Sequence, residues 1–179
     1  MNDLSVTRLW LMRAAFLLLT LVILFFHLLP LETTPRRWAA PDLVLCFALA
    51  WSMRRPEYVP ALALACAFLL ADLLLQRPPG LGAVLALIGC ENLKGRSRSL
   101  RDANFAAEWI SVSIIIVGIA VAYRVIHAVV LIEQPSLSLS LSELFLTLLV
   151  YPIVVAITHV GMGVRKASPG DLDGFGHRI

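Results

Sequence analysis

The chain has 179 residues, of which 59% are hydrophobic and 15% are charged, and its formal net charge is +3. Soluble proteins contain roughly 45–50% hydrophobic and about 25% charged residues, and a chain this short cannot bury such an apolar excess in a water-facing globule. The composition therefore excludes an ordinary soluble domain and predicts an all-α integral membrane protein. The basic residues stand in short clusters between apolar runs, which is typical of loops that orient a membrane protein and not of a nucleic-acid-binding face.

The first predicted span covers residues 9–31. Arg8 and Arg13 precede its most apolar part, as in a signal sequence, but residues 30–37 contain no small-x-small cleavage site. We therefore expect an uncleaved first helix.

The next three apolar runs are short and cover residues 38–53, 59–76 and 79–93. A helix needs about 20 residues to cross the hydrocarbon core, and shorter runs can form re-entrant or interfacial segments. Prolines mark the borders of the second of these runs, because proline is tolerated in the first turn of a helix and disfavoured in its interior. We expect all three runs to cross, which makes six spans in total. Four spans, with the second and fourth segments re-entrant, remain the alternative.

The last two predicted spans cover residues 105–132 and 144–164, and all six spans belong to one membrane domain over residues 1–166. Before the last span, serine and leucine alternate over residues 136–142, which favours a loop leading into the helix, with a short strand as the alternative. Residues 167–179 are rich in glycine and aspartate, and we expect them to form a disordered cytoplasmic tail.

The distribution of basic residues predicts how the six spans are oriented. With the N-terminus inside, the cytoplasmic segments contain eleven of them: Arg8, Arg13, Arg54, Arg55, Lys94, Arg96, Arg98, Arg101, Arg165, Lys166 and Arg178. The outer loops contain only Arg36, Arg37 and Arg77, and Arg124 lies within a span. By the positive-inside rule, both termini are expected in the cytoplasm.

Charged groups inside apolar spans are costly unless they are paired or hydrated, so they mark candidate functional positions. The orientation places four polar groups at similar depth near the outer ends of three helices: Asp42, Asp72, Arg124 and His127. One interpretation is an Asp72–Arg124 or Asp42–Arg124 ion pair. In the other, Arg124 snorkels to the outer headgroups while the carboxylates cap helix ends or meet interfacial water. Pro41 opens the second helix and favours a cap at Asp42, and for His127 an interfacial position is favoured over a proton relay.

The third span contains a stripe of small residues, Ala63, Ala67 and Ala71, which repeat every four positions. Such a stripe lets another helix approach closely, which is how helices associate in lipid. Because Asp72 adjoins the stripe, we expect this helix to form the packed centre of the bundle.

The sequence contains none of the common catalytic templates: no Gly-x-Ser-x-Gly elbow, no HExxH and no P-loop. Its three cysteines lie far apart inside apolar runs and are interpreted as packing residues, so no metal, cofactor or catalytic residue is predicted. Residues 78–82, Pro-Pro-Gly-Leu-Gly, indicate a turn between antiparallel spans. Glu108 is expected to face the basic loop 94–101 and to mark the inner end of the fifth span.

Several short motifs follow one another along the chain. They are Ala40-Pro41-Asp42-Leu43-Val44-Leu45, Trp51 through Arg54-Arg55-Pro56, Phe68-Leu69-Leu70-Ala71-Asp72-Leu73-Leu74, Gln76-Arg77-Pro78-Pro79-Gly80-Leu81-Gly82, Val150-Tyr151-Pro152 and Arg165-Lys166. Their order and spacing resemble the MreD family of bacterial rod shape-determining membrane proteins, and the proline-rich stretch 77–82 is similar to alphaproteobacterial members. The similarity covers about residues 9–166.

This resemblance implies a six-helix bundle similar to the substrate-binding components of ECF transporters, located in the bacterial inner membrane. It implies a non-catalytic scaffold of the cell-elongation (Rod) complex, needed for rod shape and lateral peptidoglycan synthesis. The implied partners are MreC, bound directly, then MreB, RodA and a class B penicillin-binding transpeptidase through the complex, and membrane lipids. The family positions that carry over are Pro41, Asp42, Asp72, Gly80 and Pro152. With the alanine stripe and Arg124, they are the candidate structural or partner-interface residues.

Two other functional classes remain open. A small-molecule-binding component of an ECF-type transporter predicts an outward-facing cavity near Asp42, Asp72 and Arg124. An intramembrane enzyme requires polar groups at the midplane of the membrane, where the sequence supplies almost none.

Overall fold

A computed structural model describes residues 2–29, 39–97, 99–100, 104–131, 136–162 and 164, with side chains from residue 6 onward. The described residues form six α-helices and one short 3-10 helix and contain no strand. The elements are α1 (Asn2–Leu28), α2 (Leu43–Arg54), η1 (Pro56–Tyr58), α3 (Ala61–Leu74), α4 (Leu81–Arg96), α5 (Phe105–Val129) and α6 (Leu137–Met162). The all-α class predicted from composition is therefore confirmed, whereas the predicted tail 167–179 lies outside the described residues.

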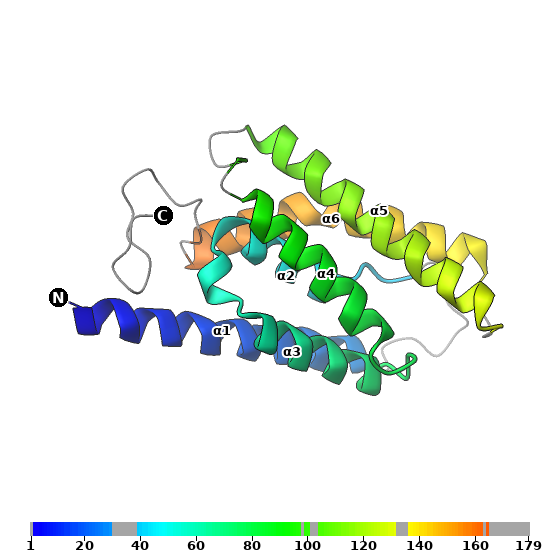
Figure 1. Ribbon diagram of the computed structural model, residues 1–179, viewed down its shortest axis with the longest axis horizontal. Helices are drawn as coiled ribbons and strands as arrows, with labels where there is room; N and C mark the ends of the chain where they lie inside the picture. The colour runs from blue at the N-terminus through cyan, green and yellow to red at the C-terminus, as the bar shows by residue number, and fades with distance from the viewer. Residues whose placement is uncertain are drawn as a thin grey trace.

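The six helices run alternately in opposite directions along the long axis of the molecule (Figure 1). At one end, which we call the proximal end, lie the start of α1 at Asn2, the end of α4 at Arg96 and the end of α6 at Met162. At the opposite, distal end lie the end of α1 at Leu28, the turn between α3 and α4, and the end of α5 at Val129.

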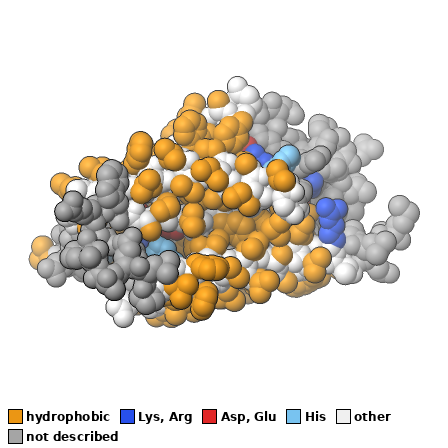
Figure 2. Space-filling view, turned by 180° about the vertical axis from the view of Figure 1, so that it is seen from behind, with side chains coloured by type: hydrophobic (Ala, Val, Ile, Leu, Met, Phe, Trp, Pro, Cys, Tyr) orange, Lys and Arg blue, Asp and Glu red, His pale blue; other side chains and the backbone are white. Residues whose placement is uncertain are grey.

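Among the described residues, three helices are long and apolar enough to cross a membrane: Val6–Leu28 within α1, Phe105–Val129 and Leu137–Met162. Hydrophobic side chains cover most of the face seen in Figure 2, as expected for a surface that meets lipid. The helices α2, α3 and α4 have 12, 14 and 16 residues. At 1.5 Å per residue each is about 18–24 Å long, shorter than the roughly 30 Å of hydrocarbon. Three membrane-length helices indicate a membrane protein, and the number of full crossings stays a prediction.

The packed centre of the bundle is α2, so the prediction that placed α3 there was wrong. All ten residues from Val44 to Met53 are buried, and α2 contacts α1, α4 and α6. Its aromatic side chains pack against α1, with the Phe16 and Phe47 rings stacked 5.3 Å apart. In contrast, α3 buries one face only. A helix that is apolar on every side is either buried in protein or spans a membrane. Helix α2, with no charged residue before Arg54, is buried among the other helices.

The alternating Ser-Leu segment is helical, so neither the predicted loop nor the alternative strand is present. Helix α6 begins at Leu137, and the Ser140 backbone N–H donates to the Ser136 carbonyl at 3.1 Å. The Ser142 hydroxyl donates to the Leu139 carbonyl at 2.8 Å, a bond within the helix that satisfies a polar side chain near lipid. The period-two pattern therefore does not describe a strand, because the serine hydroxyls find partners in a helix: Ser142 in the preceding turn and Ser140 in Arg124 of α5.

The predicted turn between α3 and α4 is confirmed. Gly80 precedes α4 with φ +91°, a left-handed conformation that glycine adopts without steric cost. The two prolines before it lack N–H groups and cannot continue α3. The turn therefore reverses the chain and brings α4 back along α3.

Candidate functional site

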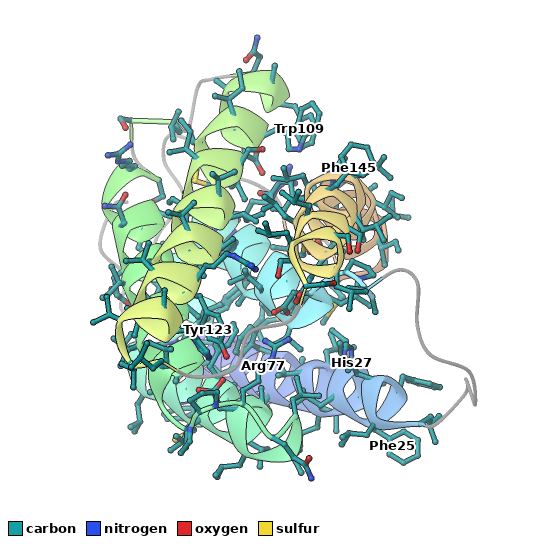
Figure 3. All side chains as sticks on the ribbon, turned by 90° about the vertical axis from the view of Figure 1, so that its right-hand side faces the viewer. Phe25, His27, Arg77, Trp109, Tyr123 and Phe145 are labelled. Carbon is teal, nitrogen blue, oxygen red and sulfur yellow. The ribbon has the colours of Figure 1, made fainter. Side chains whose placement is uncertain are left out.

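A cavity of about 530 Å³ opens at the distal end and is lined by residues from all six α-helices. Its apolar walls include Leu24 of α1, Phe68 of α3 and Ile116 of α5. Its polar lining comprises His27, Asp42, Asp72, Gln76, Arg77, Tyr123, Arg124, His127, Ser140, Glu143 and Thr147. Figure 3 looks onto this end and shows Arg77 and Tyr123 between the helices, with His27 on α1.

Asp42 holds the start of α2 in place. Its Oδ1 accepts a hydrogen bond from the Leu45 backbone N–H at 2.9 Å, so the predicted helix cap is confirmed. Its own backbone N–H donates to the Thr147 hydroxyl of α6 at 2.9 Å. Just before it, the Ala39 N–H donates to the Ser142 hydroxyl at 3.1 Å. Two hydrogen bonds, each from a backbone N–H to a side-chain hydroxyl of α6, thus attach the chain that enters α2 to α6.

The ionic partner of Asp42 is Arg77, and the Asp42–Arg124 pair of the first interpretation is not found among the described residues. The Arg77 guanidinium lies 3.4 Å from Asp42 Oδ2 and 3.4 Å from Glu143 Oε1, so it bridges α2 and α6. Burial by itself lowers the pKa of Arg77, but the neighbouring Asp42 and Glu143 carboxylates outweigh this effect and the pKa is raised. The sequence placed Arg77 in an outer loop and Glu143 in a loop before the last helix. Only the position of Arg77 directly after an apolar run hinted at a structural role.

Asp72 is buried and caps a neighbouring helix. Its carboxylate accepts hydrogen bonds from the backbone N–H groups of Gly80 at 3.0 Å and Ala83 at 3.1 Å, at the start of α4. A negative charge at a helix N-terminus is favourable because unpaired N–H groups point toward it. Asp72 therefore agrees with the interpretation in which the carboxylates cap helix ends, and no ion pair with Arg124 is found among the contacts of the described residues.

Arg124 and His127 lie on α5 and line the same cavity as the two aspartates. Arg124 donates to the Ser140 hydroxyl of α6 at 2.8 Å. The His127 ring is buried, its Nδ1 lies 2.9 Å from the Tyr123 carbonyl, and its ring packs against that of Tyr123. The structure thus places the four groups that the sequence put at similar depth around one cavity. Asp42 contacts Arg77, Asp72 caps α4, and Arg124 donates to Ser140.

A second polar cluster lies toward the proximal end and was not predicted. Glu108 is fully buried, pairs with Arg54 of α2 at 3.1 Å, and accepts a hydrogen bond from the Tyr151 hydroxyl of α6 at 3.2 Å. These contacts join α2, α5 and α6. The expected approach of Glu108 to the loop 94–101 stays a prediction, because part of that loop lies outside the described residues. The hydrogen bonds offset part of the large cost of burying a carboxylate.

The other candidate residues have packing roles. Ala67 and Ala71 are buried on the inner face of α3, Ala63 is half-buried, and α3 packs against α1 and α4. Half-buried Pro41 precedes the cap of α2, and its carbonyl accepts from the Leu43 N–H at 2.9 Å. Pro152 lies inside α6.

Among the described residues, no three His, Cys, Asp or Glu side chains are grouped to hold a metal ion. Cys46 and Cys90 are buried, Cys66 is exposed on α3, and none of them forms a disulfide. The chain matches no protein-family model, no curated protein and no solved structure.

Proposed function

We propose that this chain is a non-catalytic membrane scaffold of the bacterial cell-elongation complex, a protein of the MreD type that binds MreC by helix packing. The proposal starts from the ordered motifs around Asp42, Asp72, Gly80 and Pro152. The observation that carries it further is the role of these residues in the fold. Asp42 caps α2, and Asp72 and Gly80 together form the start of α4. Motif residues that hold helix ends against their neighbours suit a protein that works through packed helices.

The distribution of charge supports an inner-membrane location with cytoplasmic termini. Most basic residues that the structure describes lie on the proximal side of the helices or at their proximal ends: Arg8, Arg13, Arg54, Arg55, Lys94 and Arg96. Arg77 and Arg124 lie at the distal end. By the positive-inside rule the proximal end faces the cytoplasm, so the cavity opens toward the outer side.

The proposal is tested by purifying the tagged protein in mild detergent from its native membrane and identifying co-purified proteins by mass spectrometry. Recovery of MreC with RodA and a penicillin-binding transpeptidase is the expected result. Absence of MreC from a preparation that keeps the protein folded would contradict the scaffold role.

Asp72→Leu tests whether assembly depends on the motif. The substitution leaves the Gly80 and Ala83 N–H groups without their acceptor in a buried place, which costs about 1–3 kcal/mol. We expect a reduced yield of MreC and loss of rod shape. Leu73→Ala, at an exposed neighbour on α3, is the matched control and should change neither. Normal MreC recovery and normal shape in cells producing Asp72→Leu would count against the proposal.

A second candidate is a small-molecule-binding component of an ECF-type transporter, with a bundle similar to those components. The cavity favours it, because Asp42, Asp72 and Arg124 all line the distal opening. The same purification separates the two candidates. Recovery of an ATPase pair with a coupling membrane subunit, in place of MreC, would favour the transporter.

A further inference from the structure

The described residues that line the distal cavity include three carboxylates, those of Asp42, Asp72 and Glu143, and two guanidiniums, those of Arg77 and Arg124. The carboxylates of Asp42 and Glu143 share the single guanidinium of Arg77, which lies 3.4 Å from each. Charge-assisted hydrogen bonds are usually about 2.7–2.9 Å long, so both contacts are loose. The side chains of Arg77 and Glu143 are 33% and 38% exposed. Two partly exposed carboxylates with one shared cation form an acceptor for a second, small cation.

The guanidinium of Arg124 lines the same cavity as these carboxylates. Arg124 is held by Ser140, which precedes Glu143 by three residues and therefore lies on the same side of α6. Its guanidinium can bind an oxyanion such as phosphate. The cavity therefore presents an anion-binding group and a cation-binding group side by side.

The remaining lining suits the apolar part of a ligand. Leu24, Phe68, Ile116, Ile119 and Leu144 contribute apolar wall. The mouth lies where α1, α3 and α5 end, while the wall extends into the bundle. In the proposed orientation this end of the helices is at the depth of the outer lipid headgroups. The volume of about 530 Å³ is within the range of roughly 300–1,000 Å³ that is typical of ligand pockets.

We propose that the distal cavity binds a zwitterionic amphiphile, a phospholipid with a primary-ammonium headgroup. Its ammonium occupies the acceptor formed by Asp42 and Glu143, its phosphate faces Arg124, and the upper part of an acyl chain enters the apolar wall. A primary ammonium has three N–H donors for carboxylates, whereas a quaternary ammonium has none. A net anionic lipid without an amine faces the two carboxylates unfavourably. This site is independent of the proposed scaffold role, because it requires no protein partner.

The test uses the purified full-length protein, freed of native lipid in detergent and offered an equimolar mixture of dioleoyl phosphatidylethanolamine, phosphatidylcholine and phosphatidylglycerol. Retained lipids are counted by native mass spectrometry. We expect phosphatidylethanolamine to be retained about tenfold better than either competitor, a factor that one charge-assisted contact can supply. Equal retention of all three lipids would show adventitious surface lipid only and overturn the proposal.

Glu143→Gln keeps the size of the side chain and removes its charge, so it should abolish the preference for phosphatidylethanolamine over phosphatidylcholine. Glu91→Gln is the matched control, because Glu91 pairs with Lys94 near the proximal end, and it should keep the preference. An unchanged preference in Glu143→Gln would overturn the proposal.

Ala120→Leu tests the same site without touching a charge, in case the charge variant does not fold. The larger side chain fills the cavity wall, so we expect retention of phosphatidylethanolamine to fall to the level of the other lipids. Unaltered retention would overturn the site. Free phosphoethanolamine in hundredfold excess should not displace the lipid, and displacement would overturn the lipid as occupant in favour of a small zwitterion.

Discussion

Gly82 shows how a single residue determines whether α3 and α4 can pack together. It lies in the first turn of α4, directly against the carboxylate of Asp72, and a Cβ atom built at this position collides with Asp72 Oδ1. The carboxylate cannot move aside freely, because it accepts hydrogen bonds from Gly80 and Ala83. The cap on α4 therefore requires a residue without a side chain at position 82.

We predict that Gly82→Ala lowers the free energy of unfolding by about 1–3 kcal/mol, through overpacking and displacement of the cap. The measurement is thermal or denaturant unfolding of the detergent-solubilised protein. Gly118→Ala is the matched control, because nothing lies near a Cβ at that position on α5. Alanine replaces a helical glycine there and should stabilise the helix by about 0.5–1 kcal/mol. Equal effects of the two substitutions would contradict the close approach between Gly82 and Asp72.

At the scale of elements, Pro152 leaves a carbonyl of α6 to be satisfied from outside the helix. Proline has no N–H, so the carbonyl four residues earlier, that of Leu148, loses its helical donor. The Trp109 indole of α5 donates to this carbonyl at 3.2 Å. Trp109 is 40% exposed and lies beside α6 near Phe145 on the outer side of the bundle (Figure 3). The proline in α6 thus frees a carbonyl that accepts a hydrogen bond from α5.

A double-mutant cycle tests this link. Trp109→Phe should cost about 1 kcal/mol of unfolding free energy, because the Leu148 carbonyl then has no donor in an environment without water. In the Pro152→Ala background the alanine N–H can bond to that carbonyl, so Trp109→Phe should cost much less. The difference between the two costs is the coupling energy, which is measured by unfolding all four proteins. An equal cost in both backgrounds would contradict the link.

At the scale of the whole molecule, the described residues form three long helices and three short ones, and of the short ones α2 is enclosed by its neighbours. The described part of the chain alternates in direction from α1 to α6, and the turn after α3 lies at the opposite end from the end of α4. This alternation is what six crossings require. The short helices can cross where the local bilayer thins or where flanking residues extend toward the interface.

Labelling of single cysteines in intact cells tests the number of crossings. In a Cys66→Ala background, Gln76→Cys in the α3–α4 turn should react with a membrane-impermeant maleimide without permeabilisation. Arg96→Cys at the end of α4 should react only after permeabilisation. Both positions are exposed. Four spans with re-entrant segments would place residue 76 on the cytoplasmic side. Protection of this cysteine in intact cells would therefore contradict six crossings. Residue 96 is cytoplasmic in both arrangements and serves as the control.

Local patterns in the sequence were sufficient for features that depend on neighbouring residues. The all-α class follows from composition, and the cap at Asp42 and the turn at Gly80 follow from residue types next to helix borders. Where a local pattern has more than one solution, the prediction was wrong. The serines after residue 135 could bond within a helix as well as in a loop, and α6 begins there at Leu137.

The sequence by itself determined that this is a helical membrane protein with polar groups gathered near one end of its helices. Only the tertiary structure decided that α2 is the centre and that Arg77 joins Asp42 to Glu143. It also decided that Glu108 is buried against Arg54 and Tyr151. The physical reason is that these contacts connect residues far apart in the chain. A pattern along one helix shows which of its faces is apolar or polar, but the partner of that face is decided by how all six helices pack.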